Sequence, residues 1–217
     1  MTERIFISKS ASEVSALKNV LHSKGIEILP HSFLTFSSSK ISINDSFEVV
    51  FFGSPRAVHY FDDQMKIPTS VKIACIGPAT GDFIRKLGYN VDFEGAGPID
   101  LVGKEFKAWC GKQKVLFPHS NISIKTISSL FEPAQKLEIE TYKTTINACG
   151  IEPCTTYVFT SPSNVTGFFM RNKLPKNIRT IAWGSSTEKA LLNRGIHVDK
   201  TLHQPSLDNL KACLLSK

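Results

Sequence analysis

Short apolar runs alternate with amphipathic stretches along most of the chain. Residues 4–8 have the pattern of a buried strand, and residues 26–30 have the same pattern. Between them, residues 11–24 place apolar side chains at helical spacing, and Gly25 follows where the helix would end. This order predicts a strand–helix–strand opening of the kind that builds parallel sheets with helices on both faces.

The alternation continues to the C-terminus, so an α/β fold is predicted for the whole chain. Further strands are predicted at residues 48–52, 71–76, 91–93, 115–117, 137–145, 157–159 and 180–183. Helices are predicted from residue 56 and at residues 79–87, 98–110, 122–131, 164–170, 186–194 and 207–215. Two stretches that lack a helical pattern and hold many turn-forming residues, 31–46 and 147–154, are predicted to be extended connectors.

The chain matches itself without a gap at an offset of 107 residues, with residues 47–98 over residues 154–205. The matched landmarks are Ser54-Pro55 with Ser161-Pro162, Gly77 with Gly184, Thr80 with Thr187, Gly88 with Gly195 and Pro98 with Pro205. A repeat of this kind predicts two similar α/β units, and a ligand site between such units is the leading expectation.

A second match, at an offset of 110 residues, relates residues 115–120 to residues 5–10. The strand that completes the first copy at its C-terminal end therefore stands at the chain's N-terminus for the second copy. The predicted assembly is a discontinuous α/β domain of residues 1–38 plus 152–217, with an inserted α/β domain of residues 43–146. Residues 39–42 and 147–151 would join the domains as a two-segment extended linker.

Composition is that of an ordinary soluble globular protein, with 217 residues, 41% of them hydrophobic and 21% charged. No apolar run approaches the roughly 18 residues of a membrane span, and the N-terminus does not have the pattern of a signal peptide. A cytoplasmic location and no membrane partner are therefore expected. The five cysteines are scattered without paired spacing, which predicts reduced thiols and no metal site.

The formal net charge is +7, which favours an anionic partner. Nucleic-acid binding would require a basic stripe with interleaved aromatic residues, whereas Lys and Arg are spread along this chain. A small polyanionic ligand is therefore the preferred interpretation. The turns of the repeat also lack the glycine patterns of nucleotide-binding loops.

Each copy of the repeat places two hydroxyl residues at turns that follow strands. These residues are Ser54 and Thr80 in the first copy, and Ser161 and Thr187 in the second. Open α/β sheets bind ligands at the carboxyl ends of their strands, and helix N-termini there favour carboxylate or phosphate. An N-cap role is the competing interpretation for any one of them. Their recurrence at matching strand ends favours a binding site for the set.

Other strand ends carry further candidate residues. His119 and Ser120 close a strand of the middle domain, opposite Lys9 in the other domain, and all three suit anion contacts. Tyr142 is predicted to end the strand of residues 137–145, where a phenol can donate a proton to a leaving hydroxyl. A capped turn and a packing role are the respective alternatives. The sequence shows no Ser-His-Asp order, paired catalytic carboxylates or histidine pair at metal-ligand spacing.

Together these motifs resemble the uroporphyrinogen-III synthase family over nearly the whole chain. The resemblance rests on the order and spacing of the opening strand–helix–strand, residues 52–58, residues 76–80, the Tyr142 strand, residues 158–163, residues 184–187 and residues 205–207. The chain departs from the family pattern at three turns. Ser8-Lys9-Ser10 stands where a Thr-Arg-Pro-like turn is usual, Gly53 where Thr is usual, and Ser185 where Pro is frequent.

The resemblance implies two similar domains, each a parallel sheet flanked by helices, and a lyase of the hydro-lyase type without cofactor or metal. The substrate would be hydroxymethylbilane, a linear polycarboxylate tetrapyrrole. Loss of water, inversion of ring D through a spiro intermediate and ring closure would yield uroporphyrinogen III for heme biosynthesis.

The resemblance also implies roles for individual residues. Tyr142 would assist departure of the hydroxyl, and the carboxylate contacts would come from Ser54, Thr80, Ser161, Ser163 and Thr187. A monomer is the default for the family. A two-lobed anion-binding protein without catalysis is the alternative function.

Overall fold

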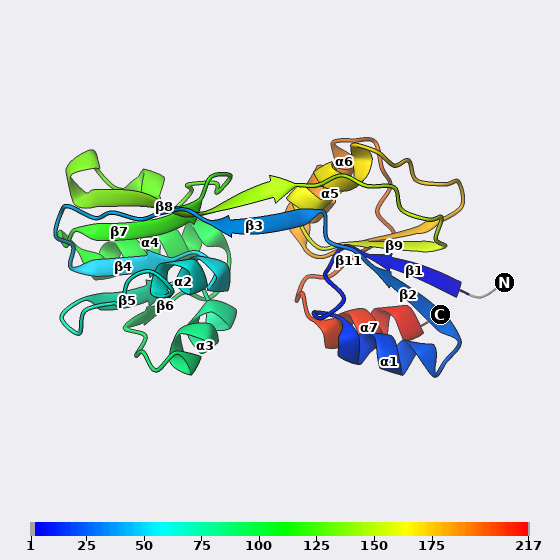
Figure 1. Cartoon of the computed structure of the whole chain (residues 1–217), viewed down its shortest axis with the longest axis horizontal. Coiled ribbons are helices and arrows are strands. Elements are labelled where there is room, and N and C mark those ends of the chain that lie inside the picture. The colour runs from blue at the N-terminus through cyan, green and yellow to red at the C-terminus, as the bar shows by residue number, and fades with distance from the viewer. Residues whose placement is uncertain (1–2, 217) are drawn as a thin grey trace. The chain divides into compact units, whose positions relative to one another are not determined.

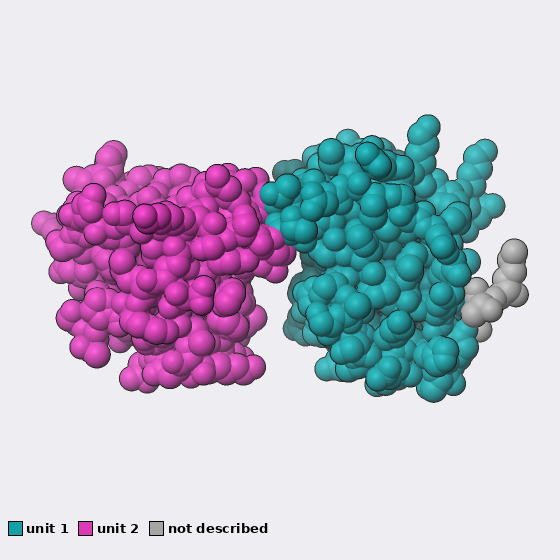
Figure 2. Space-filling view, in the orientation of Figure 1, with its two compact units in different colours: residues 1–35, 145–217 teal, residues 36–144 magenta. Residues whose placement is uncertain are grey.

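The computed structural model describes residues 3–216 and separates the chain into two compact units (Figure 2). Unit 1 comprises residues 1–35 and 145–217, and unit 2 comprises residues 36–144. Each unit contains a sheet of mostly parallel strands with helices on both faces (Figure 1). The predicted α/β class is confirmed.

The sheet of unit 1 has the strand order β11-β10-β9-β1-β2, and all its strands are parallel. Its strands are β1 (Glu3–Ile7), β2 (Ile26–Pro30), β9 (Thr156–Phe159), β10 (Arg179–Ala182) and β11 (Lys200–Thr201). Its helices are α1 (Ser15–His22), α5 (Pro162–Phe169), α6 (Ser185–Leu192) and α7 (Leu207–Leu215). Ile5 and Ile7 pack with α1 and α7 on one face, and Phe6 packs with α5 and α6 on the other.

The sheet of unit 2 has the order β3-β8-β7-β4-β5-β6. Its strands are β3 (Leu34–Ser38), β4 (Val49–Phe52), β5 (Lys72–Cys75), β6 (Phe93–Glu94), β7 (Val115–Ser120) and β8 (Lys136–Ile146). Its helices are α2 (Pro55–Asp62), α3 (Pro78–Lys86) and α4 (Ile99–Cys110), with short 3-10 turns η1 (Ser128–Leu130) and η2 (Pro133–Gln135). Val50 and Phe52 face α2 and α3, whereas Val49 and Phe51 face α4.

The internal repeat is visible as repeated structure. The elements β4, α2, β5, α3 and β6 begin 107 residues before β9, α5, β10, α6 and β11, respectively. A matching hydrogen bond recurs as well, since Asp92 accepts from the Ile73 backbone N–H and Asp199 from that of Thr180, each at 2.7 Å. The strand β1 stands beside β9 as β7 stands beside β4, so unit 1 takes this strand from the start of the chain.

Residues 34–38, predicted as part of a connector, form the strand β3, which pairs with β8. The Ser39 N–H donates to the Thr141 carbonyl at 3.0 Å, and the Asn147 N–H donates to the Phe33 carbonyl at 2.8 Å. Residue numbers rise on one strand as they fall on the other, so β3 and β8 are antiparallel. The chain passes from unit 1 to unit 2 within β3 and returns within β8.

The helix predicted at residues 122–131 is wrong, because this segment is a loop that contains only η1. The Ser120 N–H donates to the Ser123 hydroxyl at 2.9 Å, and the Ser129 hydroxyl donates to the Thr126 carbonyl at 2.8 Å. Side-chain hydroxyls that bond to the local backbone compete with helix formation, and β-branched residues lose rotamer freedom in a helix. The segment has both features.

Candidate active site

The carboxyl edge of the unit 2 sheet holds a pocket of about 270 Å³. Its walls come from the ends of β4, β5 and β7, the starts of α2 and α4, the loop after β7, and β8. Its polar side chains are Ser54, His119, Ser123, Lys125, Ser128 and Tyr142. Its apolar side chains include Phe51, Ile76, Ile99, Phe117, Ile124 and Ile127. Three residues proposed from the sequence, Ser54, His119 and Tyr142, therefore meet in one pocket.

Tyr142 is held by aromatic packing and is 7% exposed. Its ring stacks on that of Tyr60 from α2, with centroids 5.1 Å apart, and meets Phe36 of β3 at 6.3 Å. The Tyr142 hydroxyl has no hydrogen-bond partner among residues 3–216. The residue lies within β8 rather than at the predicted strand end. It is the partner of Ser120 in the last residue pair between β7 and β8. The ring is thus fixed by packing, and the residue lines the pocket.

Ser54 combines the two interpretations that its sequence context allowed. Its hydroxyl accepts the Ala57 N–H at 3.2 Å and caps α2, and the residue also lines the pocket. Gly53, beside it, faces open space, because a Cβ added there would meet no heavy atom within 4 Å. The end of β4 therefore presents backbone and a capped helix start to the pocket.

His119 and Ser120 differ in what they offer. The His119 Nδ1 lies 2.9 Å from the Ser120 carbonyl oxygen, which fixes the half-buried ring at the pocket wall. Ser120 is 4% exposed, and its hydroxyl lies 2.9 Å from that of Ser123. His119 and Ser123 line the pocket, whereas Ser120 contacts Ser123 without lining the pocket itself.

Lys125 is a pocket residue that the sequence interpretation missed as a site residue, because its segment was predicted to be a helix. Its ammonium group pairs with Glu138 of β8, whose other oxygen accepts the Ser128 hydroxyl at 2.6 Å. Burial alone would raise the pKa of Glu138, but the hydrogen bonds from Lys125 and Ser128 lower that pKa overall. The pocket wall thus carries a cation with a carboxylate partner. The hydroxyl-rich, β-branched composition of the loop was the available signal.

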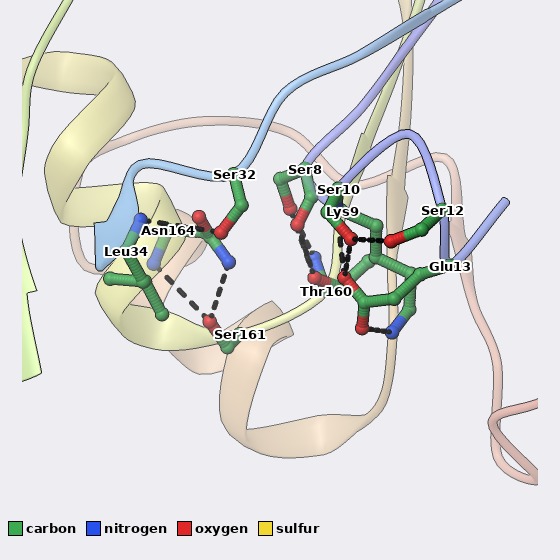
Figure 3. Close-up of polar contacts among 10 residues, drawn as sticks. All are labelled: Ser8, Lys9, Ser10, Ser12, Glu13, Ser32, Leu34, Thr160, Ser161 and Asn164. Atoms are coloured by element: carbon green, nitrogen blue, oxygen red, sulfur yellow. Dashed lines mark hydrogen bonds and ion pairs between the residues drawn. The ribbon is translucent and has the colours of Figure 1, made fainter. Parts of the chain in front are cut away.

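At the carboxyl edge of the unit 1 sheet, the ends of β1 and β9 are joined by hydrogen bonds (Figure 3). The Thr160 N–H donates to the Ser8 hydroxyl at 2.7 Å, and the Thr160 hydroxyl donates to the Ser8 carbonyl at 2.7 Å. Ser161 caps α5 by accepting the Asn164 N–H at 3.2 Å. Ser163 follows in the first turn of α5 and is half-buried.

Lys9 lies at this unit 1 edge, next to Ser8, and is already paired (Figure 3). Its ammonium group lies 3.0 Å from a Glu13 oxygen and 5.4 Å from the centre of the Trp183 ring. Burial would raise the pKa of Glu13, but hydrogen bonds from Ser10 and Lys9 lower it overall. A ligand carboxylate at Lys9 would have to share this cation with Glu13.

Thr80 and Thr187 occupy matching positions inside the first turns of α3 and α6. They are 2% and 1% exposed, and their backbone N–H groups donate to Gly77 and Gly184 at 3.0 and 3.2 Å. Burial favours a structural role for both hydroxyls. Their role in substrate binding stays a prediction, as do those of the other proposed binding residues.

Within residues 3–216, no three His, Cys, Asp or Glu side chains gather closely enough to hold a metal ion. Among the helices of the same residues, none has the length and apolar character required to cross a membrane.

These features define a class, a two-unit α/β protein with candidate chemistry at the carboxyl ends of its strands. The model of the HemD uroporphyrinogen-III synthase family matches residues 15–212, so the chain belongs to that family. It is an enzyme family of tetrapyrrole biosynthesis, and the recognition made from motif order is confirmed. No curated protein sequence matches the chain.

Solved structures show the same fold. The uroporphyrinogen-III synthetase from Helicobacter pylori 26695 is 15% identical, with a TM-score of 0.75, and the alignment covers 100% of this chain and 99% of that one. A mutant uroporphyrinogen III synthase from the extremely thermophilic bacterium Thermus thermophilus is 11% identical, with a TM-score of 0.66, over 99% of this chain and 100% of that one.

Proposed function

We propose that the chain is a lyase that converts hydroxymethylbilane into uroporphyrinogen III, with loss of water and inversion of ring D. Family membership supports this function. The observation that bears on the chemistry is the unit 2 pocket, where the Tyr142 hydroxyl is unpartnered among the described residues. Pockets for drug-sized ligands measure roughly 300–1,000 Å³, so this pocket suits part of a tetrapyrrole.

Tyr142 is the proposed proton donor to the departing hydroxyl. A phenol is protonated at neutral pH, and donation requires the phenol to lie within hydrogen-bond reach of the leaving group. Stacking on Tyr60 removes rotamer freedom from the Tyr142 ring, so little ordering remains to be done when substrate binds.

The carboxylates of the substrate are proposed to bind cations and helix N-termini at the two carboxyl edges. Lys125 and His119 are the side-chain candidates in unit 2, and Lys9 is the candidate in unit 1. The helices α2 and α5, capped by Ser54 and Ser161, add partial positive charge at their N-termini. The net charge of +7 would draw a polyanion towards the protein from solution.

The main work of the enzyme is proposed to be conformational. Hydroxymethylbilane closes unaided to the type I isomer, so the protein has to hold it in the arrangement that leads to inversion of ring D. Apolar pocket side chains such as Phe51, Phe117 and Ile127 suit contact with a pyrrole ring. We further propose that the chain acts as a cytoplasmic monomer without cofactor, metal or nucleic-acid partner.

The decisive experiment supplies hydroxymethylbilane and determines the product isomer by chromatography. We expect uroporphyrinogen III at a rate above spontaneous closure, with a protein-free reaction as the control. If only the type I isomer forms, and at the spontaneous rate, the proposed function is wrong. Tight binding of the substrate together with only type I product would identify an anion-binding protein without catalysis.

A further inference from the structure

Cys149 differs from the other cysteines in its exposure. It is half-buried, whereas Cys75, Cys110, Cys154 and Cys213 are all buried, at 0 to 9% exposure. Burial raises the pKa of Cys75 and of Cys154 to about 11, and it raises that of Cys110 as well. Because the thiolate is the reactive form, these three buried thiols are poorly reactive near neutral pH.

Cys149 also has a base beside it. Its sulfur lies 3.1 Å from the Nε2 atom of His31, which follows β2. An imidazole nitrogen at this distance can accept the thiol proton when the sulfur reacts. The His31 ring packs edge-on against Phe33, with centroids 4.9 Å apart, so the imidazole is held in a defined place.

The backbone around Cys149 is anchored by one carboxamide. Asn172 donates to the Cys149 carbonyl at 2.8 Å and accepts the Ile151 N–H at 2.7 Å. The same Asn172 amide donates to the Phe168 carbonyl in α5 at 2.9 Å. These bonds hold residues 149–151 against the end of α5, so sulfur and imidazole meet in a preorganised geometry.

We propose that Cys149 and His31 form a reactive thiol–imidazole pair, a modification site for small soft electrophiles and for peroxides. With hydrogen peroxide, the thiol proton moves to His31 Nε2 and the sulfur attacks one peroxide oxygen. The O–O bond breaks, and the leaving hydroxide takes the proton to become water. Sulfur is oxidised to a sulfenic acid while the peroxide is reduced. Neither residue lines the unit 2 pocket, so the inference does not depend on the proposed function.

Cys213 provides the strictest internal comparison. Its sulfur lies 3.4 Å from the Arg179 guanidinium, which can also stabilise a thiolate, but the residue is only 9% exposed. If charge alone decided reactivity, Cys213 would compete with Cys149. The proposal requires that base and exposure together favour Cys149.

The first test needs no variant. The intact protein is treated with limiting iodoacetamide at pH 7, and alkylation of all five cysteines is followed by peptide mass spectrometry. A rise in thiol pKa from 9.0 to about 11 lowers the thiolate fraction at pH 7 about 100-fold. We therefore expect Cys149 to react at least about 100-fold faster than Cys75 and Cys154. Faster alkylation of Cys213 or Cys154 than of Cys149 would overturn the site.

The second test isolates the base. His31→Gln is expected to slow alkylation of Cys149 by about 10-fold and to leave Cys213 unchanged, with circular dichroism confirming the fold. His22→Gln, at the exposed end of α1, is the matched control and should leave the rate unaltered. An unchanged Cys149 rate in His31→Gln would remove His31 from the proposal. Exposure to hydrogen peroxide with a sulfenic-acid trap should label Cys149 first, and labelling elsewhere first would contradict it.

Discussion

The carboxyl edges of the two sheets share one scaffold, yet two neighbouring strand ends are joined by hydroxyl hydrogen bonds in unit 1, whereas the matching strand ends line a pocket in unit 2. In unit 1, Ser8 at the end of β1 and Thr160 at the end of β9 are joined by two hydrogen bonds of 2.7 Å. The matching positions in unit 2 are Pro118 and Gly53, and both line the pocket. Neither has a hydroxyl with which to make the same link, so these two strand ends are not joined in this way in unit 2.

The strand beyond this pair differs as well. In unit 1, β2 ends at Pro30, whereas its counterpart β8 continues to Ile146 and carries Tyr142 to the pocket. The duplication accounts for the shared strands and capped helices, and changes at a few strand ends accompany the pocket lined by Tyr142 in unit 2.

The largest expected effect comes from Tyr142→Phe, which tests whether the phenol sets unit 2 apart. Loss of a general acid typically costs about 100-fold or more in rate, so we expect kcat for uroporphyrinogen III formation to fall about 100-fold. Thermal unfolding should be unchanged, because the ring that packs on Tyr60 is kept. Initial rates measure kcat, and melting curves measure thermal stability.

The unit 1 control for this change is Tyr157→Phe. The Tyr157 hydroxyl accepts the Cys154 N–H at 2.9 Å and the residue is 2% exposed, so its removal should cost about 1 kcal/mol of stability and leave kcat unaltered. A wild-type kcat in Tyr142→Phe would take Tyr142 out of the chemistry.

Substitutions at the matching positions Gly53 and Thr160 test the difference between these strand ends directly. Gly53→Val has room for its Cβ, so the protein should fold, but the side chain enters the pocket and should lower kcat/KM by about 10-fold. Thr160→Val removes the hydroxyl bond to the Ser8 carbonyl and keeps the backbone N–H bond to the Ser8 hydroxyl, so it should cost about 1 kcal/mol with the pocket intact. Denaturant titration and steady-state kinetics separate the two outcomes.

Gly53→Thr is the matched variant that distinguishes lost volume from an added hydroxyl. Full activity in Gly53→Val would mean that the substrate does not use this end of the pocket.

A smaller effect on activity is expected at Lys125, the pocket cation that pairs with Glu138. Lys125→Met should raise KM by up to about 5-fold, and more at low salt, since a half-exposed ion pair contributes below about 1 kcal/mol. Glu138→Gln should lower KM, because it frees Lys125 for the substrate. The control is Lys143→Met, at an exposed position of β8, the strand that also carries Glu138. Equal KM values in the Lys125 and Lys143 variants would exclude Lys125 from binding.

The smallest effect concerns acid stability, where the two edges should behave alike. The pKa values of Glu13 and Glu138 are lowered in the folded state, so each carboxylate stabilises the protein above its unfolded pKa of about 4.3. That stability is lost as the pH falls through the lowered folded values. Glu13→Gln and Glu138→Gln should each reduce the loss between about pH 7 and pH 3 by less than about 1 kcal/mol, measured by urea unfolding. A loss of wild-type size in both variants would contradict this assignment.

Local signals made most elements predictable from the sequence. The helices α2 and α5 begin at Pro55 and Pro162 after capping serines, and such starts depend on neighbouring residues alone. The strand β3 was predicted only as part of an extended connector, because its partner β8 lies about a hundred residues further along the chain and local alternation does not identify a partner.

The pocket residues that could be predicted from the sequence are those that stand at the ends of predicted strands. Ser54, His119 and Tyr142 were proposed as strand-end residues and line the pocket. The buried Thr80 and Thr187 show the limit of that reasoning, because a hydroxyl at a helix start has the same sequence context whether it faces solvent or the core. To predict Lys125 as a pocket residue, the conformation of its loop would have to be known. That conformation involves hydrogen bonds between serine side chains and the backbone.

The interrupted layout of unit 1 sets the order in which a newly made chain can fold. Unit 2 is continuous in sequence, but the bond between Ser8 and Thr160 spans 152 residues. The strands β1 and β2 leave the ribosome before β9, so Phe6 cannot complete its packing until β9 has been synthesised. Pairing of β1 with β9 in the unit 1 sheet is therefore expected to be the slow step of folding.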